Sequence, residues 1–599
     1  MKGNDSNMKL FKKISDVAPE KAEEIARGNY LEWCKNNDIE PELKEELLKI
    51  QNDRNALVGG FLTLIDFGTA GLRGKMKAGS ANMNIPTVEL ATQALSARVI
   101  ANGGQQNGVV IAYDSRNNSE KFSRAAACVL AANGIKTYIF KSLRPTPELS
   151  FAIRKLGCKA GINVTASHNP KEYNGYKVYW EDGAQLPPNE ADAVSQQCHE
   201  YRFFEDIRRM DYQTAVNQGI ILEIGEEIDK EYLETIHDHI ISQEAINSQK
   251  GLKIVYTPLH GAGYDLVPKA LLRAGFENVR TVPEQMILDG NFPTVEKPNP
   301  QYPESFELGC KLAQEMGGCD IILATDPDAD RVGMCAPDRN GGWFLPSGNQ
   351  AGLLMLDYII KNRRQNGNLP ENSAVVKSIV STKLAETICR KNGVRMFNVY
   401  TGFKYIGEKI KEFEKDNSQT FIFGFEESYG YLSGTYARDK DAVGTSQLIC
   451  EMAAYNKSNG KTIREALEEI YAEYGFSAEF SYDIMIDAVD VKSKISEVMD
   501  KAYALAENTD SIGGISIERV KDYKLGVVKN IKDSSQEKLP FQPDNVVAYE
   551  LGDSTEIIIR PSGTEPKFKV YSFVSADNYD DAKEKFEKIK QSLEWIEEV

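Results

Sequence analysis

Short apolar runs alternate with helix-like stretches through most of the chain. Val109–Tyr113 and Lys136–Phe140 are two such runs, and between them Lys121–Asn133 has a helical composition that ends at Gly134. Apolar runs of this length, flanked by helices, indicate strands that are buried on both faces, as in α/β layers. The pattern restarts and continues further along the chain, at Leu252–Tyr256, Asp320–Ala324 and Ala374–Val380.

The two ends of the chain have a different pattern of polar and apolar residues. Pro19–Ala26 and Pro41–Leu48 are charged and helix-like, and each opens with a proline, whose missing N–H costs nothing at a helix start. We expect them to form a helical extension packed on the first domain. Near the other end, Phe480–Ile486 alternates polar and apolar positions, and Thr555–Ile559 is strand-like. This texture predicts a smaller α+β domain at the C-terminal end.

Composition and charge narrow the class of protein. The 599 residues are 41% hydrophobic, and 71 Lys and Arg against 88 Asp and Glu give a net charge of −17. An acidic surface disfavours nucleic acid and anionic membranes as partners, because both are bound by neutralising phosphates with Lys and Arg. No apolar window approaches the ~20 residues of a membrane span. Nine cysteines without a Cys-x-x-Cys pair and a polar N-terminus predict free thiols, no secretory signal and a cytoplasmic protein.

A serine lies in a loop where α/β folds place reactive groups. The strand-like Ala160–Val164 leads into Thr-Ala-Ser-His-Asn-Pro, which contains Ser167 and His168. A small, polar, proline-punctuated loop after a strand is a common site for chemistry. Ser167 offers a hydroxyl, His168 a proton carrier and Lys177 a cation. The alternative is a serine in an ordinary turn.

An acidic loop follows a second buried strand. Asp326, Asp328 and Asp330 alternate in Asp-Pro-Asp-Ala-Asp-Arg, a spacing that lets carboxylates converge on one hard cation. A calcium EF-hand is excluded, because Arg331 stands where that loop needs glycine and Pro337 where it needs glutamate. A magnesium site with open positions is favoured, with Arg331 suited to a phosphate oxygen beside the metal. A solvated acidic turn is the alternative.

Two more strand ends carry polar loops. Gly424–Gly430 contains Glu426 and Ser428, which can accept and donate hydrogen bonds to sugar hydroxyls, although paired glutamates often simply face solvent. Arg560–Lys567 has a Ser-Gly-Thr turn between cations, and its backbone N–H groups and hydroxyls can hold a phosphate. A plain β-turn is the alternative for this second loop.

Together and in this order, the four segments resemble the α-D-phosphohexomutase superfamily of phosphoglucomutases and phosphomannomutases. The resemblance covers nearly the whole chain and implies three related α/β domains with mixed sheets, plus a smaller C-terminal α+β domain, around a deep cleft. The expected divisions are a helical extension (1–55), a first domain with the serine loop (56–212), a second with the metal loop at its end (213–318), a third with the sugar-binding loop (319–472) and a fourth with the phosphate-binding loop (473–599).

The resemblance also assigns roles to residues. It implies that Ser167 is phosphorylated in the active form and binds Mg²⁺ with the three aspartates, and that Arg73 is aimed at the phosphoserine. Lys177 is the first candidate for the catalytic proton carrier and His168 the second. The expected substrate-binding residues are Thr69, Arg331, Lys377, Thr401, Gly402, Glu426, Ser428 and Lys440. The expected phosphate-binding residues are Arg560, Ser562, Gly563, Thr564 and Lys567.

The implied activity is an intramolecular phosphoryl transfer. The resemblance is greatest to the phosphoglucomutase–phosphopentomutase branch, and we expect interconversion of glucose 1-phosphate and glucose 6-phosphate. Glucose 1,6-bisphosphate is the expected intermediate and activator, and the protein is expected to be a monomer or homodimer. Mannose or pentose phosphates, or synthesis of glucose 1,6-bisphosphate, remain alternatives for this branch. A phosphoserine-forming phosphatase is the alternative from a different class.

Overall fold

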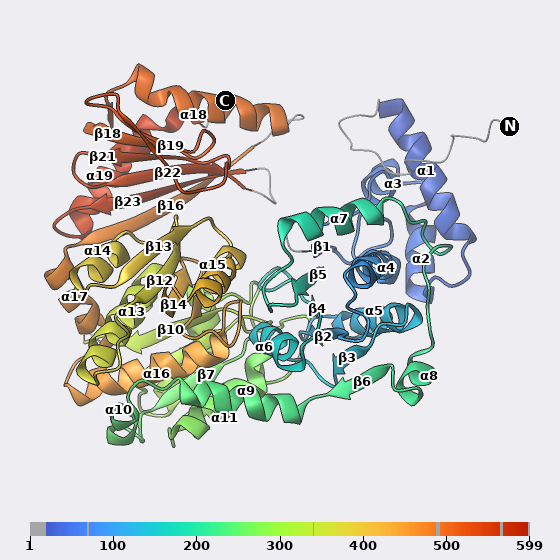
Figure 1. Ribbon diagram of the computed structural model, residues 1–599, viewed down its shortest axis with the longest axis horizontal. Coiled ribbons are helices and arrows are strands. Elements are labelled where there is room, and N and C mark those ends of the chain that lie inside the picture. Colours follow the sequence, from blue (N-terminus) through green and yellow to red (C-terminus); the bar gives the residue numbers. More distant parts are fainter. Residues whose placement is uncertain (1–18, 69–70, 340, 487–490, 563–566, 597–599) are drawn as a thin grey trace.

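The computed structural model describes residues 19–68, 71–339, 341–486, 491–562 and 567–596. Four sheets follow one another along the chain (Figure 1). The first three are mixed sheets layered with helices and the fourth is antiparallel, so the predicted fold class is confirmed. Within the described ranges, no helix is long and apolar enough to cross a membrane.

The N-terminal extension is helical and packs on the first domain. It consists of α1 (Pro19–Lys35), α2 (Pro41–Ile50) and α3 (Arg54–Phe61). Trp33 is 2% exposed, lies edge-on to Phe61 and also contacts aromatic rings that follow the first domain's α7 (Pro188–Cys198). An aromatic cluster therefore fastens the extension to the first domain.

The first sheet has six strands and holds the serine loop. Its order is β1-β5-β4-β2-β3-β6, with β2 parallel to β3 and β4, β6 parallel to β3, and β5 antiparallel to β4 and β1. The strands are β1 (Gly71–Lys75), β2 (Val109–Tyr113), β3 (Thr137–Phe140), β4 (Ala160–Val164), β5 (Tyr173–Trp180) and β6 (Ile221–Ile224). The expected domain end at residue 212 is therefore too early, because β6 completes this sheet.

The second sheet has five strands and contains the acidic loop. Its order is β11-β10-β9-β7-β8. The strands are β7 (Ile254–Thr257), β8 (Val279–Thr281), β9 (Ile321–Thr325), β10 (Val332–Pro337) and β11 (Trp343–Phe344). The expected boundary at 318/319 is wrong, because β9 pairs in parallel with β7 and β10 pairs with β9. The acidic loop thus lies inside the second domain.

The third and fourth sheets complete the chain. The third has the order β13-β12-β14-β15, from β12 (Ser373–Ser378), β13 (Arg395–Val399), β14 (Thr420–Glu426) and β15 (Gly430–Leu432). The fourth has eight strands: β16 (Ser477–Met485), β17 (Ser511–Ile512), β18 (Ile515–Asp522), β19 (Val527–Asn530), β20 (Gln536–Lys538), β21 (Val547–Leu551), β22 (Glu556–Pro561) and β23 (Lys567–Ser575).

Apolar clusters join the domains. One cluster runs from Leu149 in α6 (Thr146–Leu156) through Leu266 in α11 (Gly263–Ala274) to Ile449 in α16 (Ala442–Ser458), linking the first three domains. Another joins Tyr400 of the third domain to Tyr523 of the fourth. In Figure 1 the first domain, in blue and teal, lies on the right, and the fourth, in orange and red, at the upper left.

One structural rule places all four signature segments. Three lie at the turn between two antiparallel neighbours, namely β4/β5, β9/β10 and β14/β15, and the described ends of the fourth lie on the antiparallel neighbours β22 and β23. A turn between antiparallel strands lies at the end of its sheet, where side chains are free to point out of the layer.

Candidate active site

Ser167 is held in an unusual backbone conformation. Its φ is 51°, in the left-handed region. This conformation costs a non-glycine residue energy, and it persists only where the surrounding structure holds it. The Ser167 N–H donates to Thr165 Oγ1 at 2.8 Å, and the Thr165 hydroxyl donates to Asp114 Oδ2 at 2.6 Å. The serine loop is therefore anchored to Asp114, which directly follows β2.

Arg116 holds the serine loop in this conformation. Its side chain is 0% exposed and lies 3.3 Å from Asp114 Oδ2. The guanidinium also faces the Phe292 ring, whose centroid is 5.0 Å from Cζ. It donates four hydrogen bonds to main-chain carbonyls of the serine loop, those of Ser167 (2.5 Å), Asn169 (2.5 Å), Pro170 (3.0 Å) and Tyr173 (3.1 Å). Because one rigid guanidinium bonds four carbonyls at once, it holds the backbone of the loop in one conformation.

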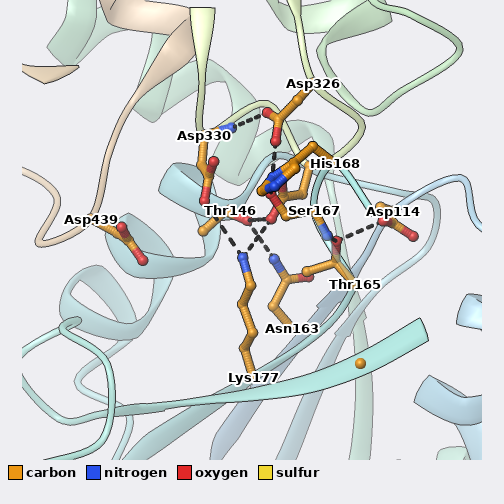
Figure 2. Close-up of polar contacts among 12 residues, drawn as sticks. Asp114, Thr146, Asn163, Thr165, Ser167, His168, Lys177, Asp326, Asp330 and Asp439 are labelled. Atoms are coloured by element: carbon orange, nitrogen blue, oxygen red, sulfur yellow. Dashed lines mark hydrogen bonds and ion pairs between the residues drawn. The ribbon is translucent and has the colours of Figure 1, made fainter. Parts of the chain in front are cut away.

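The Ser167 hydroxyl faces both a carboxylate and an imidazole (Figure 2). Its Oγ donates to Asp326 Oδ2 at 2.9 Å and lies 3.1 Å from His168 Nδ1. Burial, reinforced by the Arg331 guanidinium, lowers the pKa of His168 well below its ordinary value. The imidazole is therefore neutral near pH 7, and its Nδ1 contacts the hydroxyl, whose single proton goes to Asp326.

Three buried carboxylates meet beside this hydroxyl. Asp326, Asp328 and Asp330 each place an oxygen within 4.8 Å of the others. Asp328 Oδ1 and Asp330 Oδ1 are buried and have no hydrogen-bond partner among the described residues. Buried carboxylate oxygens without partners are costly, and a hard divalent cation is the ligand that would satisfy them. The three residues therefore fit the predicted metal site.

Charge in this cluster is distributed unequally. Burial raises the pKa of Asp326 well above its ordinary value, and the neighbouring Asp328 and Asp330 raise it further. For Asp330, burial alone would raise the pKa, but Lys440 and Lys177 outweigh burial and lower it. The cluster therefore depends on its cations to hold negative charge.

Those cations come from two domains. Lys177, on β5, lies 2.8 Å from Asp328 Oδ2 and 3.5 Å from Asp330 Oδ2. Lys440, after β15, lies 3.1 Å from Asp330 Oδ2 and 2.8 Å from Asp439 Oδ1. Burial lowers the pKa of each lysine, but the carboxylates outweigh it and the net shift is upward. Both ammonium groups thus remain charged beside the acidic cluster.

The predicted sugar-binding loop is preorganised by its own domain. Glu426 is 5% exposed and accepts a 2.6 Å hydrogen bond from the Gly402 N–H. Burial and the adjacent Glu427 raise the pKa of Glu426 to about 7. Ser428 is partly buried in the same turn. The structure thus joins Glu426 to Gly402, two residues that were predicted separately.

Of three other predicted residues, two lie in the third domain and one reaches the serine loop. The Lys377 ammonium is buried and lies 3.2 Å from both Ser381 O and Glu386 Oε1, within the third domain. The Thr401 hydroxyl is buried without a hydrogen-bond partner among the described residues. Arg73 donates to Asn169 Oδ1 at 2.9 Å and so reaches the serine loop. The binding roles of these residues stay predictions.

The predicted phosphate loop is only partly described. Arg560 lies on β22, and the Ser562 N–H donates to the Lys567 carbonyl at 2.8 Å. Lys567 Nζ is 2.8 Å from Asp483 Oδ2. Burial raises the pKa of Glu427, and Arg560 of this loop and Lys569 of β23 partly offset that rise, so Arg560 lies near the sugar loop. Gly563, Thr564 and Thr69 fall outside the described residues.

Sequence reasoning missed two residues of this centre. Thr146 contacts Asp328 of the acidic loop, and Asn163 contacts Thr146. Thr146 had only one local signal, a position between two prolines at the start of a helix. Asn163 looked like any polar residue near a strand end.

Known proteins resemble this chain over most of its length. Residues 64–205, 230–341 and 347–474 match alpha/beta/alpha domains I, II and III of phosphoglucomutase/phosphomannomutase. A phosphoglucomutase of Staphylococcus haemolyticus (strain JCSC1435) is 35% identical over 527 residues, covering 87% of this chain and 92% of that protein.

Solved structures share the fold. Pp63/parafusin, a phosphoglucomutase from Paramecium in its open form, has a TM-score of 0.65 at 18% identity, covering 89% of this chain and 94% of that one. A phosphoglucomutase/phosphomannomutase family protein from Burkholderia thailandensis has a TM-score of 0.64 at 18% identity, covering 89% and 98%.

Proposed function

Because the chain belongs to the phosphoglucomutase/phosphomannomutase family, we propose that it interconverts glucose 1-phosphate and glucose 6-phosphate. Membership confirms the resemblance to the α-D-phosphohexomutase superfamily and makes the chain a phosphohexomutase. The observation that carries the proposal is the Ser167 hydroxyl, 2.9 Å from one of three metal-competent carboxylates.

The proposed reaction starts from phosphorylated Ser167. The phosphoryl group passes from Ser167 Oγ to the free hydroxyl of the sugar monophosphate, so the Oγ–P bond breaks and a sugar O–P bond forms. The proton of that hydroxyl ends on Ser167 Oγ, directly or through a side chain. The bisphosphate, glucose 1,6-bisphosphate, then turns by about half a turn and returns its other phosphate to Ser167.

Two residues remain candidates for moving that proton. His168 Nδ1 lies 3.1 Å from Ser167 Oγ, and its lowered pKa keeps the imidazole neutral, which leaves one ring nitrogen open to a proton but makes it a weak base. Lys177 holds its proton against Asp328, and its raised pKa suits it to balancing phosphate charge. The geometry therefore supports His168 as the nearer carrier and Lys177 as a counter-charge.

The remaining predicted groups bind and orient. Glu426 and Ser428 would hold sugar hydroxyls, and the loop from Arg560 to Lys567 would hold the phosphate that is not reacting. Asp326, Asp328 and Asp330 would hold Mg²⁺, which when bound offsets charge on the transferring group. Nine free thiols within the described ranges support a reducing, cytoplasmic location.

The test is product formation from three substrates. The protein is incubated with glucose 1-phosphate, mannose 1-phosphate or ribose 1-phosphate, with and without glucose 1,6-bisphosphate, and products are followed by ³¹P NMR. We expect fastest isomerisation of glucose 1-phosphate, stimulation by the bisphosphate, and loss of turnover in Ser167→Ala with an unchanged circular dichroism spectrum. Release of inorganic phosphate without isomerisation would instead indicate the phosphatase alternative.

A further inference from the structure

Thr146 connects the first domain to the metal loop of the second. It is 0% exposed, at the start of α6, 182 residues before Asp328. The Thr146 N–H donates to the Asp328 carbonyl at 2.8 Å, and its hydroxyl donates to Asp328 Oδ2 at 2.9 Å. One residue thus holds both the main chain and the carboxylate of a predicted metal ligand.

Asn163 sets the direction of that hydroxyl. It is 0% exposed on β4 and donates from Nδ2 to Thr146 Oγ1 at 2.6 Å, as Figure 2 shows. A hydroxyl has one proton, and because Asn163 occupies an acceptor site of Thr146, that proton is directed at Asp328. The opposite amide orientation would leave Thr146 facing two acceptors with a single proton.

The two oxygens of Asp328 therefore have different surroundings. Oδ2 accepts from Thr146 at 2.9 Å and from Lys177 at 2.8 Å. Oδ1 is buried and has no hydrogen-bond partner among the described residues. Fixing one oxygen by two donors sets the carboxylate rotamer and leaves the other oxygen available to a cation.

We propose that Thr146 is a positioning residue that aims Asp328 Oδ1 at the divalent cation, with Asn163 orienting its hydroxyl. The inference rests on the metal site of the proposed function. Outer-shell hydrogen bonds of this kind commonly change metal affinity about 10- to 100-fold.

The surrounding segment is anchored without this hydroxyl. Arg144 binds Asp229 of α9 (Glu226–Asp238) through two hydrogen bonds, of 2.8 and 2.9 Å, and donates from its N–H to the Tyr113 carbonyl at 3.1 Å. The Thr146 N–H bond to Asp328 is also independent of the side chain. Thr146→Val, which keeps the shape and removes the hydroxyl, should therefore fold.

The experiment measures Mg²⁺ affinity by calorimetry on dephosphorylated full-length protein without substrate. We expect Thr146→Val to raise the Kd for Mg²⁺ about 10- to 100-fold, and Thr146→Ser, which keeps the hydroxyl, to bind as the parent does. The matched control is Thr137→Val, because Thr137 is a buried threonine of the same domain whose hydroxyl donates to the Ile135 carbonyl at 3.0 Å. Its Kd should equal that of the parent.

Several results would overturn the inference. They are parent-like affinity in folded Thr146→Val, equal weakening in Thr137→Val, or failure of Thr146→Ser to preserve binding. If Thr146→Val does not fold, Asn163→Val decides instead: we expect weakened binding, and a parent-like Kd overturns the proposal. A parent that binds no Mg²⁺ overturns it too, whereas Mg²⁺ binding without isomerisation overturns only the proposed function.

Discussion

Arg116→Lys should damage catalysis far more than a conservative exchange of cations suggests. Nη1 serves the Pro170 and Tyr173 carbonyls, and Nη2 serves those of Ser167 and Asn169. An ammonium is a single point, so it can replace one of these nitrogens and leaves the other pair of carbonyls without a donor.

The magnitude follows from the two lost hydrogen bonds. At about 1.5 kcal/mol each, the lower end for a charged donor, they total about 3 kcal/mol. That loss exceeds the roughly 1–2 kcal/mol cost of holding Ser167 in the left-handed region, so other loop conformations become accessible. If most of that 3 kcal/mol, about 2.7 kcal/mol, is lost from the catalytically competent loop conformation, kcat falls about 100-fold.

The assay combines steady-state kinetics with amide hydrogen exchange of residues 165–173. We expect a lower kcat together with faster exchange in that segment. Arg124→Lys is the control, because this arginine is 47% exposed and its ion pair, at 3.0 Å, is with the exposed Glu120. The reasoning is refuted if Arg116→Lys keeps the parent's kcat, or if Arg124→Lys loses as much.

Two further predictions concern stability. Burial raises the pKa of Glu451 from 4.5 to about 7. Between these two pH values the folded state keeps a proton that the unfolded chain loses. The free energy of unfolding therefore falls by up to about 3 kcal/mol as the pH rises from 4.5 to about 7. Glu451→Gln should remove this fall, measured as urea midpoints at about pH 5 and pH 8; equal pH dependence in both proteins contradicts the assignment. Trp33→Ala should cost about 3–5 kcal/mol and expose the helical extension to protease, because the indole packs against Phe61, Phe203 and Phe204; unchanged cleavage would show that the extension docks by other contacts.

Features that depend on residues close together in the sequence could be predicted from the sequence. Val109–Tyr113 forms a strand with every residue buried, as its apolar character predicted. The alternating aspartates converge because three carboxylates at spacing two share one tight turn. The fold class, the four loops and the acidic cluster could therefore be predicted from the order of residues alone.

Only the tertiary structure decided what each loop meets. The domain boundaries predicted from the sequence separate β6 and β9 from the sheets to which they belong. Strand pairing is decided by partners far along the chain, so the sequence did not reveal these pairings. Thr146 reaches Asp328 across 182 residues, and Lys440 reaches Asp330 from another domain. Contacts at such separations leave no periodicity or spacing in the sequence, since they depend on how the sheets pack, and packing sets the orientation of the carboxylates in the acidic loop.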